Sequence, residues 1–182
     1  VAPEPPQPIS NEAPPIPQSI AAIMPANAAQ VTELARLGRG IVNDIAWLPN
    51  ENVLAIATSL GVWFYDPATR EFRRYVETVY PPGKMAIALD GQTFVSGSSE
   101  DGTVRLWNVA DGTLLRTFEG HGFRVERVAI APDGQTLAAV ADNTTIKLWN
   151  AADGTLLRTL EDHRGEVMSL AFTPDGQMLV SG

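Results

Sequence analysis

The chain repeats itself with a period of 42 residues, and this periodicity limits its fold more than any local feature does. Trp107 in VRLWN returns as Trp149 in IKLWN, and His121 returns as His163, each 42 positions later. A unit that recurs at a fixed spacing is one supersecondary element, which buries its apolar faces against its neighbours. The sequence therefore predicts a repeat architecture from about residue 31 onward.

Each period contains the signals of four short strands joined by tight turns. In the third period, the apolar pattern predicts strands near 125–130, 136–140, 145–150 and 156–160. The Ala-Pro-Asp-Gly sequence at 131–134 fits a type I turn with a G1 bulge, which joins the first two strands as a hairpin. The second and third strands are apolar on both faces, so each sheet must be covered on both sides. A radial stack of like sheets satisfies this need.

Four motifs resemble those of the WD-repeat β-propeller family, in which a period of about 40–45 residues folds into a four-stranded blade. They are GH at 120–121, APDGQTL at 131–137, TVRLWN at 103–108 and TIKLWN at 145–150. The resemblance covers residues 31–182 and implies an all-β fold of four-stranded antiparallel propeller blades. Asn108 and Asn150 stand where the family usually has Asp.

The repeat phase divides the chain into a Pro-rich extended linker at 1–27 and a WD-repeat propeller segment at 28–182. The expected blades lie at about 41–76, 83–118 and 124–160, followed by a partial blade at 166–182. Three full repeats and part of a fourth predict an open arc, because closed propellers typically have about four to eight blades. We therefore expect the chain to be an internal piece of a longer product.

Residues 27–40 carry two conflicting signals. Asn27 as an N-cap and Gly38 just past the last apolar position favour a helix. The repeat alignment instead favours a short turn at 27–30 and a strand at about 31–37, and we prefer the strand. In the family that the motifs resemble, such a leading strand pairs with the last blade and closes the ring.

The N-terminal stretch is rich in proline: residues 1–25 hold eight of the 14 prolines and no Lys or Arg. Such a composition favours an extended, polyproline-like tether. Three P-x-x-P spacings, which begin at Pro3, Pro5 and Pro14, leave open that a polyproline-binding partner recognises the segment. We prefer the linker interpretation.

The resemblance also implies a hydrogen-bonded set within each blade, made of a loop Asp, the His of Gly-His, a second-strand Ser or Thr and the third-strand Trp. The matching residues are Asp101, Ser96 and Trp107 in the second repeat, His121, Asn143 and Trp149 in the third, and His163 and Ser181 in the fourth. Thr78 takes the histidine position of the second repeat, and Ala139 takes the hydroxyl position of the third. The networks are thus expected to be partial. Each unmade buried hydrogen bond costs about 1 kcal/mol.

No pattern in the chain indicates catalysis. Without cysteine there is neither a thiolate zinc site nor a cysteine nucleophile, and the H-E-x-x-H, P-loop and G-x-S-x-G patterns are missing. His121 and His163 are the only histidines, and they share one phase of the repeat, as packing residues would. The six Asp-Gly pairs fit hairpin turns better than calcium loops. We expect no catalytic residue, no metal site and no cofactor.

The charge balance narrows the classes of partner. A formal net charge of −8 disfavours nucleic acid, whose binding requires a basic face. No apolar run approaches the roughly 18 residues that span a bilayer, so no membrane insertion is expected.

Trp47 and Trp63 do not occupy the position at which Trp107 and Trp149 recur in the repeat. We expect both side chains in the core between blades.

Loops that a rigid scaffold holds in place are the preferred position for recognition. The candidate partner-binding residues are Arg39, Phe123, Arg124 and Arg164 before the first strands, and Glu100 and Asp142 in the turns. The alternative is that these six residues form a solvated rim that binds no partner. The sequence favours a non-catalytic scaffold that binds a protein or peptide. A sensory or regulatory propeller tethered to an enzyme outside this segment, such as a bacterial protein kinase, is the other hypothesis.

The compartment follows only weakly from the sequence. The near-identical stretches at 108–117 and 150–159 indicate recent duplication, which is typical of bacterial members of the family. Together with the Pro-rich tether and the missing cysteines, this favours an exported or cell-surface location over a cytoplasmic one.

Overall fold

The computed structural model describes residues 40–49, 51–120, 122 and 124–182. The chain divides into two units, residues 1–38 and 39–182, and all of the described residues belong to the second. The expected tether at 1–27 and the expected closing strand at 31–37 lie outside the described residues. The fold below is that of the second unit alone.

Every regular element in the described part of the chain is a β-strand. The strands are β1 (Val42–Trp47), β2 (Leu54–Thr58), β3 (Gly61–Asp66), β4 (Glu71–Glu77), β5 (Pro82–Ile87), β6 (Thr93–Ser98), β7 (Val104–Asn108), β8 (Leu114–Phe118), β9 (Val125–Ile130), β10 (Thr136–Ala141), β11 (Thr145–Asn150), β12 (Leu156–Leu160), β13 (Leu170–Phe172) and β14 (Leu179–Ser181).

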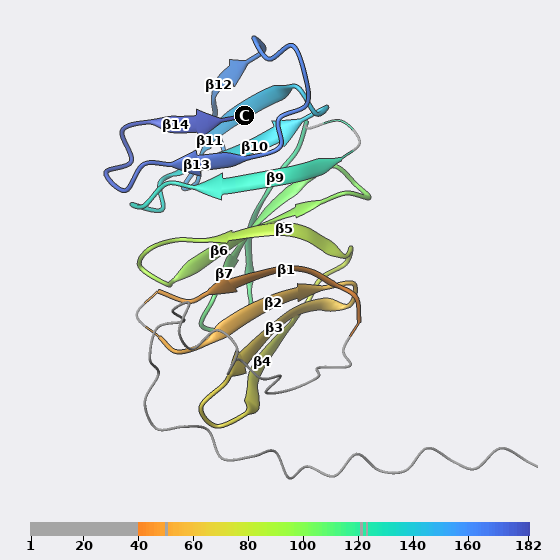
Figure 1. The fold of residues 1–182 in the computed structure, drawn as a ribbon, viewed down its shortest axis with the longest axis vertical. Coiled ribbons are helices and arrows are strands. Elements are labelled where there is room, and N and C mark those ends of the chain that lie inside the picture. The colour runs from red at the N-terminus through yellow and green to blue at the C-terminus, as the bar shows by residue number, and fades with distance from the viewer. Residues whose placement is uncertain (1–39, 50, 121, 123) are drawn as a thin grey trace, which may run out of the picture. The chain divides into compact units, whose positions relative to one another are not determined.

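These strands form three four-stranded sheets and one two-stranded hairpin, each antiparallel and in chain order (Figure 1). The first strands of successive sheets lie next to one another, β1 beside β5, β5 beside β9 and β9 beside β13. The described sheets do not close into a ring. The predicted all-β fold of four-stranded antiparallel blades in an open arc is therefore confirmed.

The Asp-Gly turns at 90–91, 133–134 and 175–176, at the first hairpins of the second, third and fourth sheets, have the geometry that the sequence predicts. Gly134 adopts a φ of 70°, and its N–H donates to the carbonyl of Ala131 at 2.9 Å. The Asp133 carboxylate accepts from the N–H of Gln135 at 2.9 Å, which caps the turn. Because a positive φ strains any residue with a Cβ, Gly is favoured at this point.

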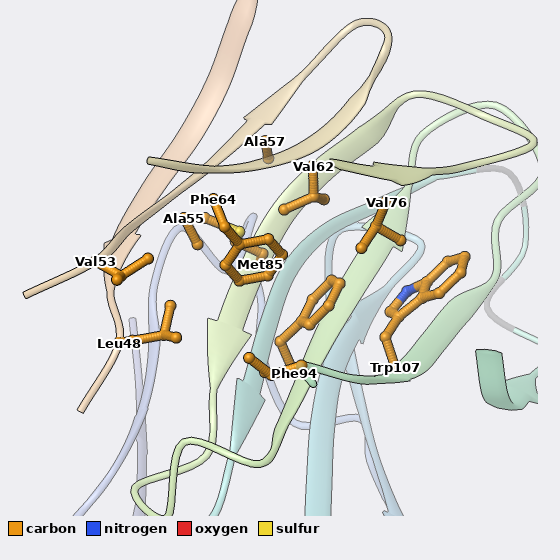
Figure 2. Close-up of a cluster of buried hydrophobic side chains, with 11 residues drawn as sticks. Leu48, Val53, Ala55, Ala57, Val62, Phe64, Val76, Met85, Phe94 and Trp107 are labelled. Carbon is orange, nitrogen blue, oxygen red and sulfur yellow. The ribbon is translucent and has the colours of Figure 1, made fainter. Parts of the chain in front are cut away.

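The core lies between the sheets. Phe64 of β3 meets Phe94 of β6 edge to face, with ring centroids 5.8 Å apart, and Phe94 stacks on Trp107 of β7 at 6.0 Å (Figure 2). The next interface packs Val125 and Trp149 against residues of the second sheet. The second strands β2, β6 and β10 are almost entirely buried.

Polar contacts fix the offset between the first two sheets. The Asn43 amide donates to the carbonyl of Pro82 at 2.8 Å. The Lys84 ammonium donates to the carbonyl of Asn43 at 3.1 Å and pairs with the Asp44 carboxylate at 3.5 Å. Asp44 also accepts from the N–H of Met85 at 2.9 Å. These directional bonds set which residues of β1 and β5 face each other, which apolar packing alone does not specify.

The outward faces of the first and last described sheets are apolar and exposed. Ile45 and Trp47 of β1 are 59% and 57% exposed, and Met178 and Val180 next to or in β14 are both 61% exposed. The expectation that Trp47 belongs to the core between blades is thus wrong, since no described sheet covers that face of β1. Trp63 packs against Phe72 and Tyr75 of β4, within its own sheet.

We predict that the chain self-associates through these two faces, because sheets with exposed apolar surfaces and strand edges pair with further chains. The double variant Ile45→Lys, Val180→Lys should shift the chain toward monomer. Size exclusion with light scattering at micromolar concentration measures this. Equal association of the parent chain and the variant would contradict the prediction.

Candidate interaction face

One end of the described unit collects its most variable loops. In an antiparallel sheet of sequential strands, the turn between the second and third strands and the connection to the next sheet lie at the same end. Gly61 pairs with Glu77 in register, and the N–H of Val167 donates to the carbonyl of Asn143 at 2.7 Å, so the structure shows this placement directly. We call this end the loop face. It comprises residues 40–41 ahead of β1, the turns 59–60, 99–103 and 142–144, and the described residues of the connections: 78–81, 119–120, 122, 124 and 161–169.

Beneath the loop face, the second repeat forms one strong side-chain hydrogen bond. The Trp107 indole N–H donates to the Ser96 hydroxyl at 2.9 Å, and both side chains are buried. Asp101 does not extend this bond to position 78. Its carboxylate instead accepts from the hydroxyl of Thr103 at 2.9 Å and pairs with Arg105. The buried hydroxyl of Thr78 has no hydrogen-bond partner among the described residues.

The environment of Asp101 determines its protonation. Burial by itself would raise the pKa of this carboxyl, but hydrogen bonds from Arg105, Ser98 and Thr103 outweigh it and lower the pKa to about 2. Arg105 also lies over the ring of Tyr80, with its guanidinium carbon 5.6 Å from the ring centroid. The carboxylate thus remains ionised at neutral pH and holds the Arg105 side chain against the connection 78–81.

The third and fourth repeats form different links. Trp149 is buried and meets Phe118 edge to face at 6.1 Å, while His121 lies outside the described residues. The Asn143 amide donates to the Glu166 carboxylate at 3.2 Å, so its side chain reaches the connection ahead of β13. In the fourth repeat, the His163 Nε2 and the Ser181 hydroxyl lie 2.8 Å apart in a hydrogen bond.

The structure places four of the six candidate partner-binding residues on the loop face. Glu100, Arg124, Asp142 and Arg164 are all exposed there. Arg124 forms an ion pair with Glu126 at 3.3 Å. Arg39 and Phe123 lie outside the described residues, so their placement is not tested.

Sequence reasoning missed a group of exposed apolar side chains on the same face. Ile41, Leu60 and Val79 are 74%, 55% and 83% exposed. A comparison of equivalent turns would have revealed them, since the turn that holds Leu60 carries Glu100 and Asp142 in the next two repeats.

Among residues 40–182 that the structure describes, no three His, Asp or Glu side chains cluster closely enough to hold a metal ion. In the same part of the chain, no helix has the length and apolar character to cross a membrane.

Comparison with known proteins yields one family. The family model described as "WD domain, G-beta repeat" matches residues 84–108, 112–150 and 154–182. Protein Notchless of Drosophila melanogaster is 42% identical over 48 residues, which are 26% of this chain and 10% of that protein. Protein groucho of the same species is 28% identical over 126 residues, 66% of this chain and 17% of that protein.

A bacterial relative matches more of the chain. An uncharacterized WD repeat-containing protein of Synechocystis is 31% identical over 137 residues, which are 72% of this chain and 38% of that protein. The chain therefore spans less than half the length of each of these three relatives.

We predict that the Trp107–Ser96 hydrogen bond contributes about 1 kcal/mol to the free energy of unfolding, as buried hydrogen bonds do. Trp107→Phe and Ser96→Ala should each destabilise the chain, and the double variant should lose less than the sum of the two. Chemical denaturation of the four proteins gives the coupling energy. Strictly additive losses would show that the bond contributes nothing.

Acid titration tests the environment of Asp101. A carboxyl whose pKa is lower in the folded state stabilises the fold above its unfolded pKa near 3.8, and this contribution disappears as pH falls toward about 2. Asp101→Asn should therefore lower the free energy of unfolding at neutral pH. Between pH 3.8 and about 2, the stability of the variant should fall less steeply with pH than that of the parent chain. Thermal melts across this range measure it. An unchanged slope in the variant would contradict the assignment.

Proposed function

Because the chain belongs to the WD-repeat family, we propose that it is a non-catalytic scaffold whose loop face binds another protein. The observation that carries this proposal is the contrast between the loop face and the rest of each repeat. The stretches at 108–117 and 150–159, which include the turns at the opposite end, are nearly identical, whereas the loop-face turns 99–103 and 142–144 differ in length and charge. A repeated scaffold with variable exposed loops is the arrangement that recognition sites use.

The charges of the loop face support a protein partner. Exposed carboxylates and guanidinium groups alternate there, with Glu100 and Asp142 in turns and Arg124 and Arg164 in connections. Mixed charges of this kind give specificity and steer encounter between proteins. The net charge of −8 works against a nucleic-acid partner, which would repel an acidic chain.

A second candidate function is a sensory or regulatory propeller that is tethered to an enzyme outside this segment. The Pro-rich composition of residues 1–27 favours a spacer of the kind that joins two such parts. On the same composition and the lack of cysteine, we propose an exported or cell-surface location.

Site-specific photocrosslinking in the source cells tests the scaffold proposal. A photoreactive side chain at Glu100, Asp142 or Arg164 should yield a defined adduct with a partner protein. The matched control is Leu157, which is 54% exposed on the outermost strand β12 and lies outside the loop face. Adducts that form only at Leu157, or adducts at none of the positions, would refute the proposal.

A further inference from the structure

Five exposed or half-exposed apolar and aromatic side chains gather at the loop face of the first repeat. We call them the first-repeat patch: Ile41, Leu60, Tyr75, Val79 and Tyr80. Val79 at 83% and Ile41 at 74% are the most exposed, and the two tyrosines are each 38% exposed. Exposed apolar groups that cluster in this way mark interaction surfaces more often than isolated ones do.

Backbone and side-chain bonds bring the patch together. The N–H of Ser59 donates to the carbonyl of Ile41 at 2.9 Å, which places Ile41 beside the turn of Leu60. The Tyr75 hydroxyl donates to the carbonyl of Leu60. Gly61 pairs with Glu77, so the chain that continues to Val79 runs past the same turn. Ile41, Leu60 and Tyr75 are thus held together before any partner binds, which lowers the entropy cost of binding.

The fold itself does not require these apolar side chains. The turn of Leu60 is occupied by Glu100 in the second repeat and by Asp142 in the third. Thr78 takes the position of His121 and His163 in the repeat. Val79, the next residue, therefore corresponds to Gly122 in the third repeat and to Arg164 in the fourth. The same blade geometry therefore forms with polar residues or glycine at these points, and the apolar character belongs to the surface of the first repeat alone.

Negative charge borders the patch. Burial is the main cause that raises the pKa of the Tyr75 hydroxyl, and the negative charge of the nearby Glu77 is the second. Glu100 is exposed in the neighbouring turn. Neither carboxylate forms an ion pair among the described residues, whereas Lys84 is paired with Asp44 and Arg105 with Asp101. Among the described residues, the unpaired carboxylates that border the patch therefore make its surroundings negative.

We propose that the first-repeat patch binds a segment of a partner protein that presents an apolar or aromatic side chain flanked by Lys or Arg. The proposal rests on the proposed scaffold function and names the chemistry of its partner. An apolar side chain would pack on the exposed Leu60 and Val79, and the flanking cation would pair with Glu77 or Glu100.

Charge disfavours the other two occupants. The chain's own residues 1–25 carry two carboxylates and no Lys or Arg, so they would meet the acidic border with like charge. A second copy that docked patch to patch would bring its own exposed Glu77 and Glu100 to the same border, and these like charges would repel. The self-association predicted above uses the outward faces of β1 and β14 instead.

Fluorescence polarisation with short labelled peptides tests the proposal on the full chain. The probes share a central Leu-Phe pair and differ only in flanking residues, which are Lys, Ser or Glu. The Lys-flanked peptide should bind at least about tenfold more tightly than the Glu-flanked one, and added salt should reduce the difference. Equal binding of the Lys-flanked and Glu-flanked peptides would overturn the proposal.

Substitutions locate the binding. Leu60→Glu and Val79→Glu should each weaken binding of the Lys-flanked peptide about tenfold or more. Leu157→Glu is the matched control, because Leu157 is 54% exposed and Leu60 is 55% exposed. Thermal melts show whether each variant is folded, and if Leu60→Glu does not fold, Leu60→Ser takes its place. An equal loss for Leu157→Glu would overturn the assignment of the patch.

The remaining outcomes separate this inference from the proposed function. If the Lys-flanked peptide binds but only Asp142→Ala or Arg164→Ala weakens it, the loop face is a binding face and the first-repeat patch is the wrong part of it. If a synthetic peptide of residues 1–25 binds more tightly than the Lys-flanked probe, the occupant is the chain's own segment. If the Lys-flanked probe does not bind while photocrosslinks form at Glu100, this inference fails and the scaffold function stands.

Discussion

The structure depends on strands that are apolar on both faces and must be covered on both sides. β6 shows this most directly, because Phe94 packs into the interface with the first sheet while its neighbour Val95 packs into the interface with the third. Alternate residues of a strand point to opposite faces, so a single sheet cannot bury both. Stability is therefore a property of neighbouring sheets, as in other repeat proteins. Where no described sheet covers a face, as on the outward side of β1, apolar side chains such as Ile45 and Trp47 remain exposed.

Once the sheets are packed against each other, the loops at their ends carry little of the stability. Most core residues lie in the strands or directly beside them, and Val167 is a core residue in the last connection. Leu60 and Val79 on the loop face remain exposed. Loops are thus free to differ between repeats without cost to the stack. Asp101 forms a partial exception, because its ion pair with Arg105 holds the β6–β7 turn against the connection that contains Tyr80. A fixed loop of this kind is suited to presenting a defined surface.

The candidate site was accessible to sequence reasoning only in part. The charged residues Glu100 and Asp142 could be assigned to turns, because turn signals are local. The apolar residues of the first-repeat patch were missed, since an exposed Leu or Val looks like a core residue in a pattern of hydropathy. The network residues show the same limit. Ser96 and Trp107 meet as their repeat positions suggest, whereas Asp101 pairs with Arg105 and Asn143 with Glu166, choices that depend on which side chains are in reach.

The sequence by itself determined the four-stranded repeat, its period and its turns, because these follow from spacing, alternation and the backbone freedom of glycine. Only the tertiary structure decided which faces are covered and which polar groups pair. Trp47 ends β1 and Trp107 lies within β7, yet Trp47 is 57% exposed and Trp107 is 5% exposed. The difference lies in whether a neighbouring sheet packs on that face, and burial of this kind depends on residues distant in sequence rather than on the residue itself.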